Sequence, residues 1–109
     1  MSDLTGRQCK TDAQLLNPEQ IPRYLSSLEP RWERSADGNT ISREFSFANY
    51  YETIAFVNLV ASLAYRQNHH PELSVGYNRC RVEYSTHSAG GLTDNDFICA
   101  AKIDLMLRI

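Results

Sequence analysis

The sequence lacks the features that mark membrane-spanning, secreted and nucleic-acid-binding proteins. Apolar runs such as Ile54–Val57 are only four residues long, whereas a bilayer-spanning helix needs about 20. The start, MSDLTGRQCKTDAQ, has no apolar segment typical of a secretory signal. Basic residues are not in excess, with 11 Lys and Arg against 13 Asp and Glu. We therefore expect a cytoplasmic protein with neither a membrane nor a nucleic acid as partner.

Cysteine is also scarce. Cys9, Cys80 and Cys99 cannot all pair within one chain, and none of them has the CxxC spacing of a zinc site. We expect reduced thiols, with Cys80 and Cys99 as small core residues.

What is present predicts one globular domain over residues 1–109. The chain has 42% apolar and 22% charged residues, which is ordinary for a folded domain. Residues 1–17 have no periodicity and are expected to form a loose N-terminal arm. A first helix is predicted to follow, with Asn17 as its cap and Pro18 at its first position. Its apolar residues recur at helical spacing until Pro30: Ile21, Tyr24, Leu25 and Leu28.

The rest of the chain alternates between strand-like and helical patterns. Asp37-Gly38 and Asn78-Arg79 predict turns of two hairpins. Between them, residues 49–68 predict a long helix that lies along the core. Its apolar stripe is Tyr50, Ile54, Val57, Ala61 and Ala64, flanked by Phe56, Val60 and Leu63. Thr93 is expected to cap a last helix that buries Phe97, Ile98, Ala101 and Leu105. The order α-β-β-α-β-β-α predicts an α+β two-layer sandwich, a four-stranded antiparallel sheet with three helices on one face.

Four polar residues fall at the ends of these elements. His69 and His70 end the long helix before Pro71, His87 follows the last strand, and Asp96 lies in the first turn of the last helix. Each has an ordinary structural explanation, because histidine suits a helix C-terminus and Asp96 fits a capping box with Thr93. Their placement together favours a shared site.

Two chemistries suit such a set. Histidines can act as general acid and base near neutral pH, with an aspartate orienting one ring, and activity would then drop below about pH 6. Alternatively, His69 or His70, His87 and Asp96 would ligate zinc, although adjacent histidines are a poor match for helical metal pairs, which sit four residues apart. Acid–base chemistry is favoured, and a nucleophilic cysteine or serine is least favoured.

At these residues the sequence resembles the pterin-4a-carbinolamine dehydratases. The family motif joins His-His-Pro, Thr-x-His and Gly-Leu-(Thr/Ser)-x-x-Asp, which here fall at 69–71, 86–87 and 91–96, with Thr86 and His87 adjacent and no residue between them. The resemblance runs from about Trp32 to Ile109. Two positions depart from it: Leu73 stands where the family commonly has Trp, and Asn68 stands where an acidic residue is frequent.

The resemblance implies a lyase without a cofactor or metal, which removes water from a 4a-hydroxytetrahydropterin to give the quinonoid dihydropterin. This reaction recycles the pterin of aromatic amino acid hydroxylases, so a functional link to such an enzyme is implied. By analogy His69 and His70 carry the acid–base work, His87 polarises the substrate and Asp96 orients it. Substrate-binding roles are expected for Glu72, Ser85 and Thr86, and for Trp32, whose ring would lie over the flat heterocycle. A half-buried strand aromatic is an equal alternative for Trp32.

A non-enzymatic alternative remains, because some family members also bind a transcription factor's dimerisation helix. The exposed edges of a four-stranded sheet further predict self-association as a homodimer or tetramer.

Overall fold

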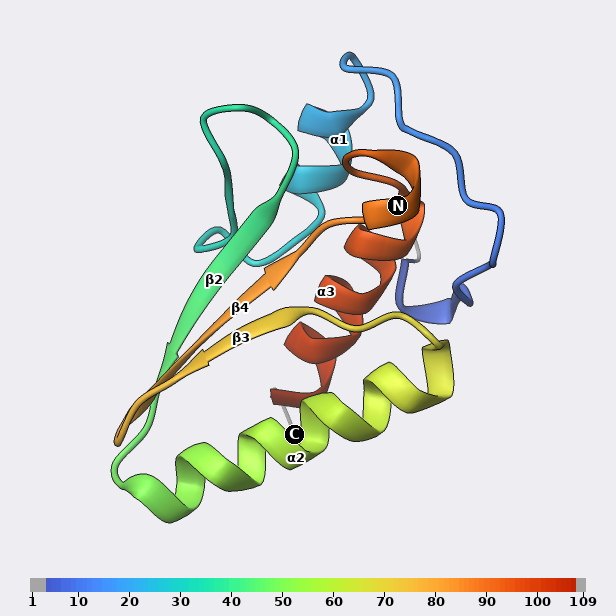
Figure 1. Cartoon of the computed structure of the whole chain (residues 1–109). Coiled ribbons are helices and arrows are strands. Elements are labelled where there is room, and N and C mark those ends of the chain that lie inside the picture. The colour runs from blue at the N-terminus through green and yellow to red at the C-terminus, as the bar shows by residue number, and fades with distance from the viewer. Residues whose placement is uncertain (1–3, 108–109) are drawn as a thin grey trace.

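The chain forms a four-stranded antiparallel sheet with its helices on one side (Figure 1). A computed structural model describes residues 4–107. Its strands lie in the order β1-β2-β4-β3. The predicted α+β class is confirmed. The elements are η1 (Leu4–Gly6), α1 (Ile21–Ser26), β1 (Glu33–Arg34), β2 (Ile41–Ser46), α2 (Tyr50–Gln67), β3 (Glu72–Val75), β4 (Arg79–Tyr84), η2 (His87–Ala89) and α3 (Asp94–Leu107).

The two predicted hairpins meet at the centre of the sheet. β2 pairs with β4 in the register Ile41↔Tyr84 to Ser46↔Arg79, with β1 and β3 on the outer edges. Alternate residues of the central strands point toward the helices, and the others carry polar side chains on the outer face. The inward residues are Ile41, Arg43, Phe45, Cys80, Val82 and Tyr84.

Helix α2 has the predicted bounds but a different buried face. Its N-cap, Asn49, accepts a hydrogen bond from the Glu52 amide at 2.9 Å, and its C-cap is Asn68. The buried residues are Thr53, Phe56, Val60 and Leu63, so the core lies along the predicted flank of the stripe and not along the stripe from Tyr50 to Ala64. The apolar surface of this helix is wider than the part that the sheet covers. Thr53 is polar but can occupy the core because its hydroxyl hydrogen-bonds to the Asn49 and Tyr77 carbonyls.

Helix α3 begins with the predicted cap. The Thr93 hydroxyl accepts from the Asn95 amide at 3.2 Å, and the Thr93 amide donates to Asp96 at 2.9 Å, a reciprocal arrangement of the capping-box type. Phe97, Ile98 and Ala101 are buried as predicted. Leu105 is 43% exposed, which corrects its predicted burial: the buried face continues instead through Ile103 and Asp104.

Helix α1 is shorter than predicted and starts later. Asn17 is not its cap; the Asn17 amide instead donates to the side chain of Gln20, which occupies the N-cap position without a side-chain capping bond. Pro22, rather than Pro18, lies in the first turn. The Asn-Pro pair forms a separate turn before the helix, a structure that it favours equally well.

The N-terminal arm is held against the helices over its described part, contrary to the loose arm that we expected. Leu4 is buried, Lys102 donates to the Thr5 carbonyl at 2.8 Å, and the Leu16 amide donates to the Leu92 carbonyl. Figure 1 shows this blue segment running along the outside of α3. Residues 1–3 lie outside the described residues. Between residues 4 and 107 no helix combines the length and apolarity that crossing a membrane requires.

Candidate active site

A histidine and a buried aspartate form the most protected part of the candidate site. The distance between His69 Nε2 and Asp96 Oδ1 is 2.7 Å. The His69 side chain is 12% exposed and that of Asp96 is fully buried. The hydrogen bond orients the imidazole, stabilises its positive charge whenever it is protonated, and leaves Nδ1 as the nitrogen for proton exchange with a ligand.

The second carboxylate oxygen of Asp96 is held from two sides. It accepts from the Thr86 hydroxyl and from the Thr93 amide, each at 2.9 Å. The Thr86 and Thr93 hydroxyls also bond to each other at 2.7 Å. Burying a carboxylate is costly unless donors replace the lost water, and here the end of β4, the start of α3 and the imidazole supply them.

The end of α2 positions His69. Asn68 has φ 53°, in the left-handed region, where asparagine and glycine are favoured at helix ends. This is a local reason for Asn68 at a position where the family often has an acidic residue. The reversal turns the chain so that the His69 ring stacks on the inward-facing Tyr84, with 5.7 Å between ring centroids and 15° between planes.

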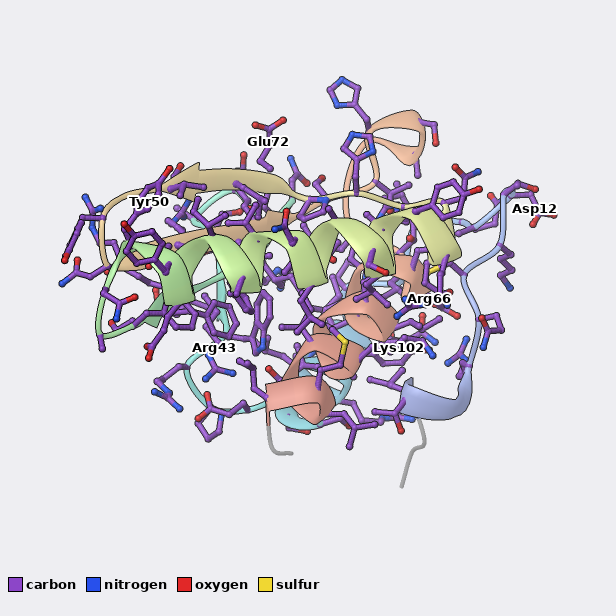
Figure 2. All side chains as sticks on the ribbon, turned by 90° about the horizontal axis from the view of Figure 1, so that it is seen from below. Asp12, Arg43, Tyr50, Arg66, Glu72 and Lys102 are labelled. Carbon is purple, nitrogen blue, oxygen red and sulfur yellow. The ribbon has the colours of Figure 1, made fainter. Side chains whose placement is uncertain are left out.

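The next histidine has different surroundings. His70 lies in a small hollow of about 110 Å³ together with Pro71, Glu72, Glu83, Ser85 and His87. Both His70 and His87 are exposed. Glu72 and Glu83 are paired across β3 and β4, and Figure 2 shows Glu72 projecting away from the long helices. The hollow therefore opens on the outer face of the sheet, whereas His69 lies with the inward-facing Tyr84.

The short helix η2 brings His87 to this hollow. It starts directly after Thr86, and Gly90, with φ 81°, ends it in a left-handed conformation that glycine adopts without strain. The chain then returns to pair Gly91 with Thr86. Thr86 is thereby fixed toward Asp96 while the following residue, His87, is presented to solvent.

The predicted site residues thus fall into two groups and one exception. His69, Asp96 and Thr86 lie together, and so do His70, Glu72, Ser85 and His87. Thr86 contacts the carboxylate of Asp96 rather than the hollow.

The exception is Trp32, which we expected to lie over a flat ligand. Its side chain is 3% exposed and packs against Phe45 and Tyr84. Its indole N–H donates to Asp104 at 2.9 Å, and Asp104 also accepts from Arg43 at 2.7 Å. The expectation is wrong because the ring is in the core, where no ligand in the hollow can reach it.

Two residues of the site were not predicted from the sequence. Tyr84 stacks against His69, and Glu83 lines the hollow. The strand alternation contained a signal for both, because it places Tyr84 inward and Glu83 outward. However, strand register decides that Tyr84 contacts His69 and that Glu83 lies in the hollow with His70 and His87.

Leu73 also has a clear place. It is paired with Val82 on the inner face of the sheet and is partly buried against the core. A tryptophan at this position would also point toward the core. The presence of Leu73 therefore does not change the lining of the hollow that contains His70 and His87.

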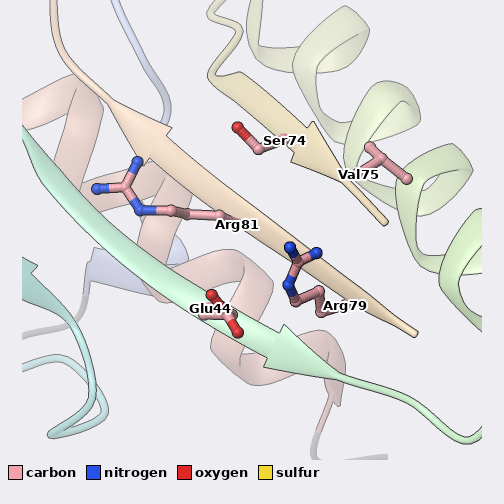
Figure 3. A pocket seen from close by; sticks show the side chains of 5 residues that line it. All are labelled: Glu44, Ser74, Val75, Arg79 and Arg81. Carbon is pink, nitrogen blue, oxygen red and sulfur yellow. The ribbon is translucent and has the colours of Figure 1, made fainter. Parts of the chain in front are cut away.

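A larger hollow of about 200 Å³ lies elsewhere on the outer face of the sheet. Figure 3 shows its lining side chains on three strands: Glu44, Ser74, Val75, Arg79 and Arg81. It holds no histidine and no buried carboxylate. In the part of the chain from 4 to 107, no three His, Cys, Asp or Glu side chains are grouped so that they could hold a metal ion.

A two-layer α+β domain in which a histidine paired with a buried aspartate adjoins two exposed histidines is suited to proton transfer. The comparisons with known proteins agree with this class. Residues 14–106 match the model of the family described as pterin 4 alpha carbinolamine dehydratase. The chain belongs to this family of hydro-lyases.

Curated relatives match over nearly the whole chain. A Legionella pneumophila protein named "Putative pterin-4-alpha-carbinolamine dehydratase" is 52% identical and covers 97% of this chain and 96% of its own. A Nitrosomonas eutropha protein of the same name is 51% identical, with 96% and 94% covered. The crystal structure described as "transcriptional coactivator/pterin dehydratase from Brucella Melitensis" is 30% identical, with a TM-score of 0.78 and 84% and 96% covered.

Proposed function

We propose that this protein removes water from a 4a-hydroxytetrahydropterin to give the quinonoid dihydropterin, by acid–base catalysis with histidine side chains. Family membership supports the reaction class. The observation that carries the mechanism is that His70 and His87, from separate parts of the chain, line one hollow, and that His69, which precedes His70 in the chain, is held by a buried carboxylate.

The reaction needs two proton transfers on neighbouring atoms. A proton must reach the 4a-hydroxyl so that the C4a–O bond breaks and water leaves. The proton on N5 must be removed, and the N–H electron pair then forms the C=N bond. One protonated and one neutral imidazole suffice, and each such group contributes typically 10²–10⁴-fold in rate.

We assign these transfers to His69 and His70, with His87 binding and polarising the substrate beside His70. Asp96 stabilises the charge on His69 in either direction of transfer, which is the role of a carboxylate behind a catalytic imidazole. Glu72 and Ser85 line the same hollow and offer hydrogen-bond acceptors to the amino and ring N–H groups of a pterin. The Ser85 hydroxyl itself donates to the Asn39 carbonyl at 2.9 Å, so it presents its lone pairs.

The test is the ultraviolet decay of a freshly made 4a-hydroxytetrahydropterin in a stopped-flow instrument, with and without the protein. His70→Ala and His87→Ala should each slow the catalysed decay at least tenfold, because each removes an imidazole from the hollow. Ser74→Ala, on the exposed outer face of β3, is the matched control and should turn over normally. Unchanged turnover in both histidine variants would remove the hollow from the mechanism.

A second role is favoured by the exposed surface of α2. Tyr51 and Tyr65 are 80% and 88% exposed and Leu59 is 39% exposed, an unusual number of large apolar side chains for one surface helix. The Brucella protein's description includes transcriptional coactivator. We therefore also propose self-association as a homodimer or tetramer, and a protein-binding role as the alternative function. With the dehydratase reaction we propose a functional link to an aromatic amino acid hydroxylase and a cytoplasmic location.

Light scattering measures the oligomeric state directly. The protein-binding alternative would be preferred over the enzymatic one if His87→Ala abolished dehydration and left the biological effect of the protein intact.

A further inference from the structure

Two of the three thiols, 90 positions apart in the sequence, lie in direct contact. Cys9 on the N-terminal arm and Cys99 on α3 have their sulfur atoms 3.5 Å apart. Cys99 is fully buried, whereas Cys9 is partly exposed. Cys80 is buried in β4. A disulfide needs the sulfur atoms at about 2.0 Å, so Cys9 and Cys99 have to approach by roughly 1.5 Å.

Hydrogen bonds from the backbone of Cys9 and Lys10 to two helices hold the arm in place around the Cys9 sulfur. The Cys9 amide donates to the Gln67 side chain at the end of α2, at 2.9 Å. The next residue, Lys10, exchanges two hydrogen bonds with the Asn95 side chain, at 3.1 and 2.8 Å. Because Asn95 lies one turn before Cys99 on the same helix, these bonds hold the two sulfur atoms together.

The two thiols also differ in acidity. The pKa of Cys9 is lowered, first by its hydrogen bond with the Cys99 thiol and further by the charge of the nearby His69. The pKa of Cys99 is raised, first by the same hydrogen bond and then by burial. The more accessible thiol is therefore the more acidic of the two, as in a nucleophilic cysteine with a resolving partner.

We propose that Cys9 and Cys99 form a reversible disulfide when the protein meets a peroxide, and that this bond locks the N-terminal arm onto α3. The Cys9 thiolate attacks one oxygen of hydrogen peroxide; an S–O bond forms, the O–O bond breaks, and the leaving hydroxide takes up the proton that the Cys9 thiol released, which gives a sulfenic acid and water. The Cys99 sulfur then attacks the Cys9 sulfur, the S–S bond forms, the S–O bond breaks, and a second water leaves with the Cys99 proton. Two electrons pass from the thiols to the peroxide, and a dithiol reductant restores both thiols.

The bond would act next to the candidate active site. The arm is bonded to Gln67 and Asn95, which lie close in sequence to His69 and Asp96 respectively. A cross-link between residues 9 and 99 closes a long loop, which restricts the unfolded chain strongly. The oxidised protein should therefore unfold at a higher temperature than the reduced protein.

The test counts free thiols in denaturant after brief treatment with stoichiometric hydrogen peroxide. The wild-type chain should fall from three thiols to one, and Cys80→Ala from two to none. Cys9→Ser, which changes a partly exposed residue of the arm, should not form an intramolecular disulfide. Peptide mass mapping should identify a Cys9–Cys99 cross-link, lighter by two hydrogen atoms, which disappears with dithiothreitol.

Two results would overturn the proposal: a wild-type chain that keeps Cys99 free while Cys9 is oxidised further or joined to another molecule, and a cross-link that involves Cys80. Because the readout is thiol content and mass, the outcome is independent of whether the protein dehydrates a pterin.

Discussion

His69 and His70 are neighbours in the chain, yet they belong to two different regions of the candidate site. His69 lies in an inner region, 12% exposed, stacked on Tyr84 and bonded to a buried carboxylate. His70 lies in an outer region with His87, where both rings are exposed. The difference teaches that one dipeptide supplies both an imidazole whose orientation is set before a ligand arrives and one that is free to adjust to it.

The inner region owes its rigidity to Asp96. One carboxylate joins the ends of α2, β4 and the start of α3, through His69, Thr86 and Thr93. The outer region has no such centre. Its residues come from a strand edge and a short 3₁₀ turn. Glu72 and Glu83 are paired there across β3 and β4, and the Glu83 carboxylate accepts a hydrogen bond from Arg81 at 2.9 Å.

The largest effect should follow loss of the carboxylate in the inner region. Asp96→Ala leaves the Thr93 amide and the His69 ring without their acceptor in a buried place, at about 1–3 kcal/mol for each unmet group. We expect the free energy of unfolding, measured with urea, to fall by about 3 kcal/mol or more.

Asp94→Ala is the matched control. Asp94 is also in the first turn of α3 but is partly exposed, and its carboxylate pairs with the exposed Arg7. Its loss should cost less than about 1 kcal/mol. Equal losses in the two variants would mean that Asp96 contributes only as a helix-end charge and not as the centre of the inner region.

We expect an effect of intermediate size when the two histidines are compared by the stability of their variants and not by catalytic rate. His69→Ala removes the stack on Tyr84 and a hydrogen bond to a charged group, so we expect a loss of about 2 kcal/mol in unfolding free energy. His70→Ala changes an exposed side chain and should stay within about 0.5 kcal/mol. Urea unfolding of both variants checks this, and a His70 variant that is as unstable as the His69 variant would contradict the division into two regions.

The smallest effect should arise at Asn68, the C-cap of α2, which directly precedes the two histidines. Asn68→Ala places a side chain that disfavours the left-handed conformation at φ 53°, and should cost about 1 kcal/mol or less, while Asn68→Gly should be close to neutral. Thermal unfolding of the pair measures the difference. If alanine were tolerated as well as glycine, the left-handed end of α2 would not be what directs His69 inward.

Much of the fold could be predicted because its signals are local. The Asp37-Gly38 turn and the Thr93–Asp96 capping box each involve residues within four positions of one another. The helix α1 was predicted less well, since Asn17-Pro18 is compatible with both a helix start and a separate turn.

The candidate site was only partly predictable for the opposite reason. The motifs identified His69, His70, His87 and Asp96, but not their grouping. The sequence alone does not show that Trp32 lies in the core and not against the ligand, because its hydrogen-bond partner, Asp104, is 72 positions away.

The sequence by itself determined where α2, α3 and the two hairpins lie, since spacing and capping act over one or two turns of the chain. Only the tertiary structure decided that β2 pairs with β4, that the arm docks on α3, and that neighbouring histidines face different regions. These outcomes depend on contacts between segments far apart in the chain, and a strand's two faces are equivalent until its register with a partner makes one of them the core.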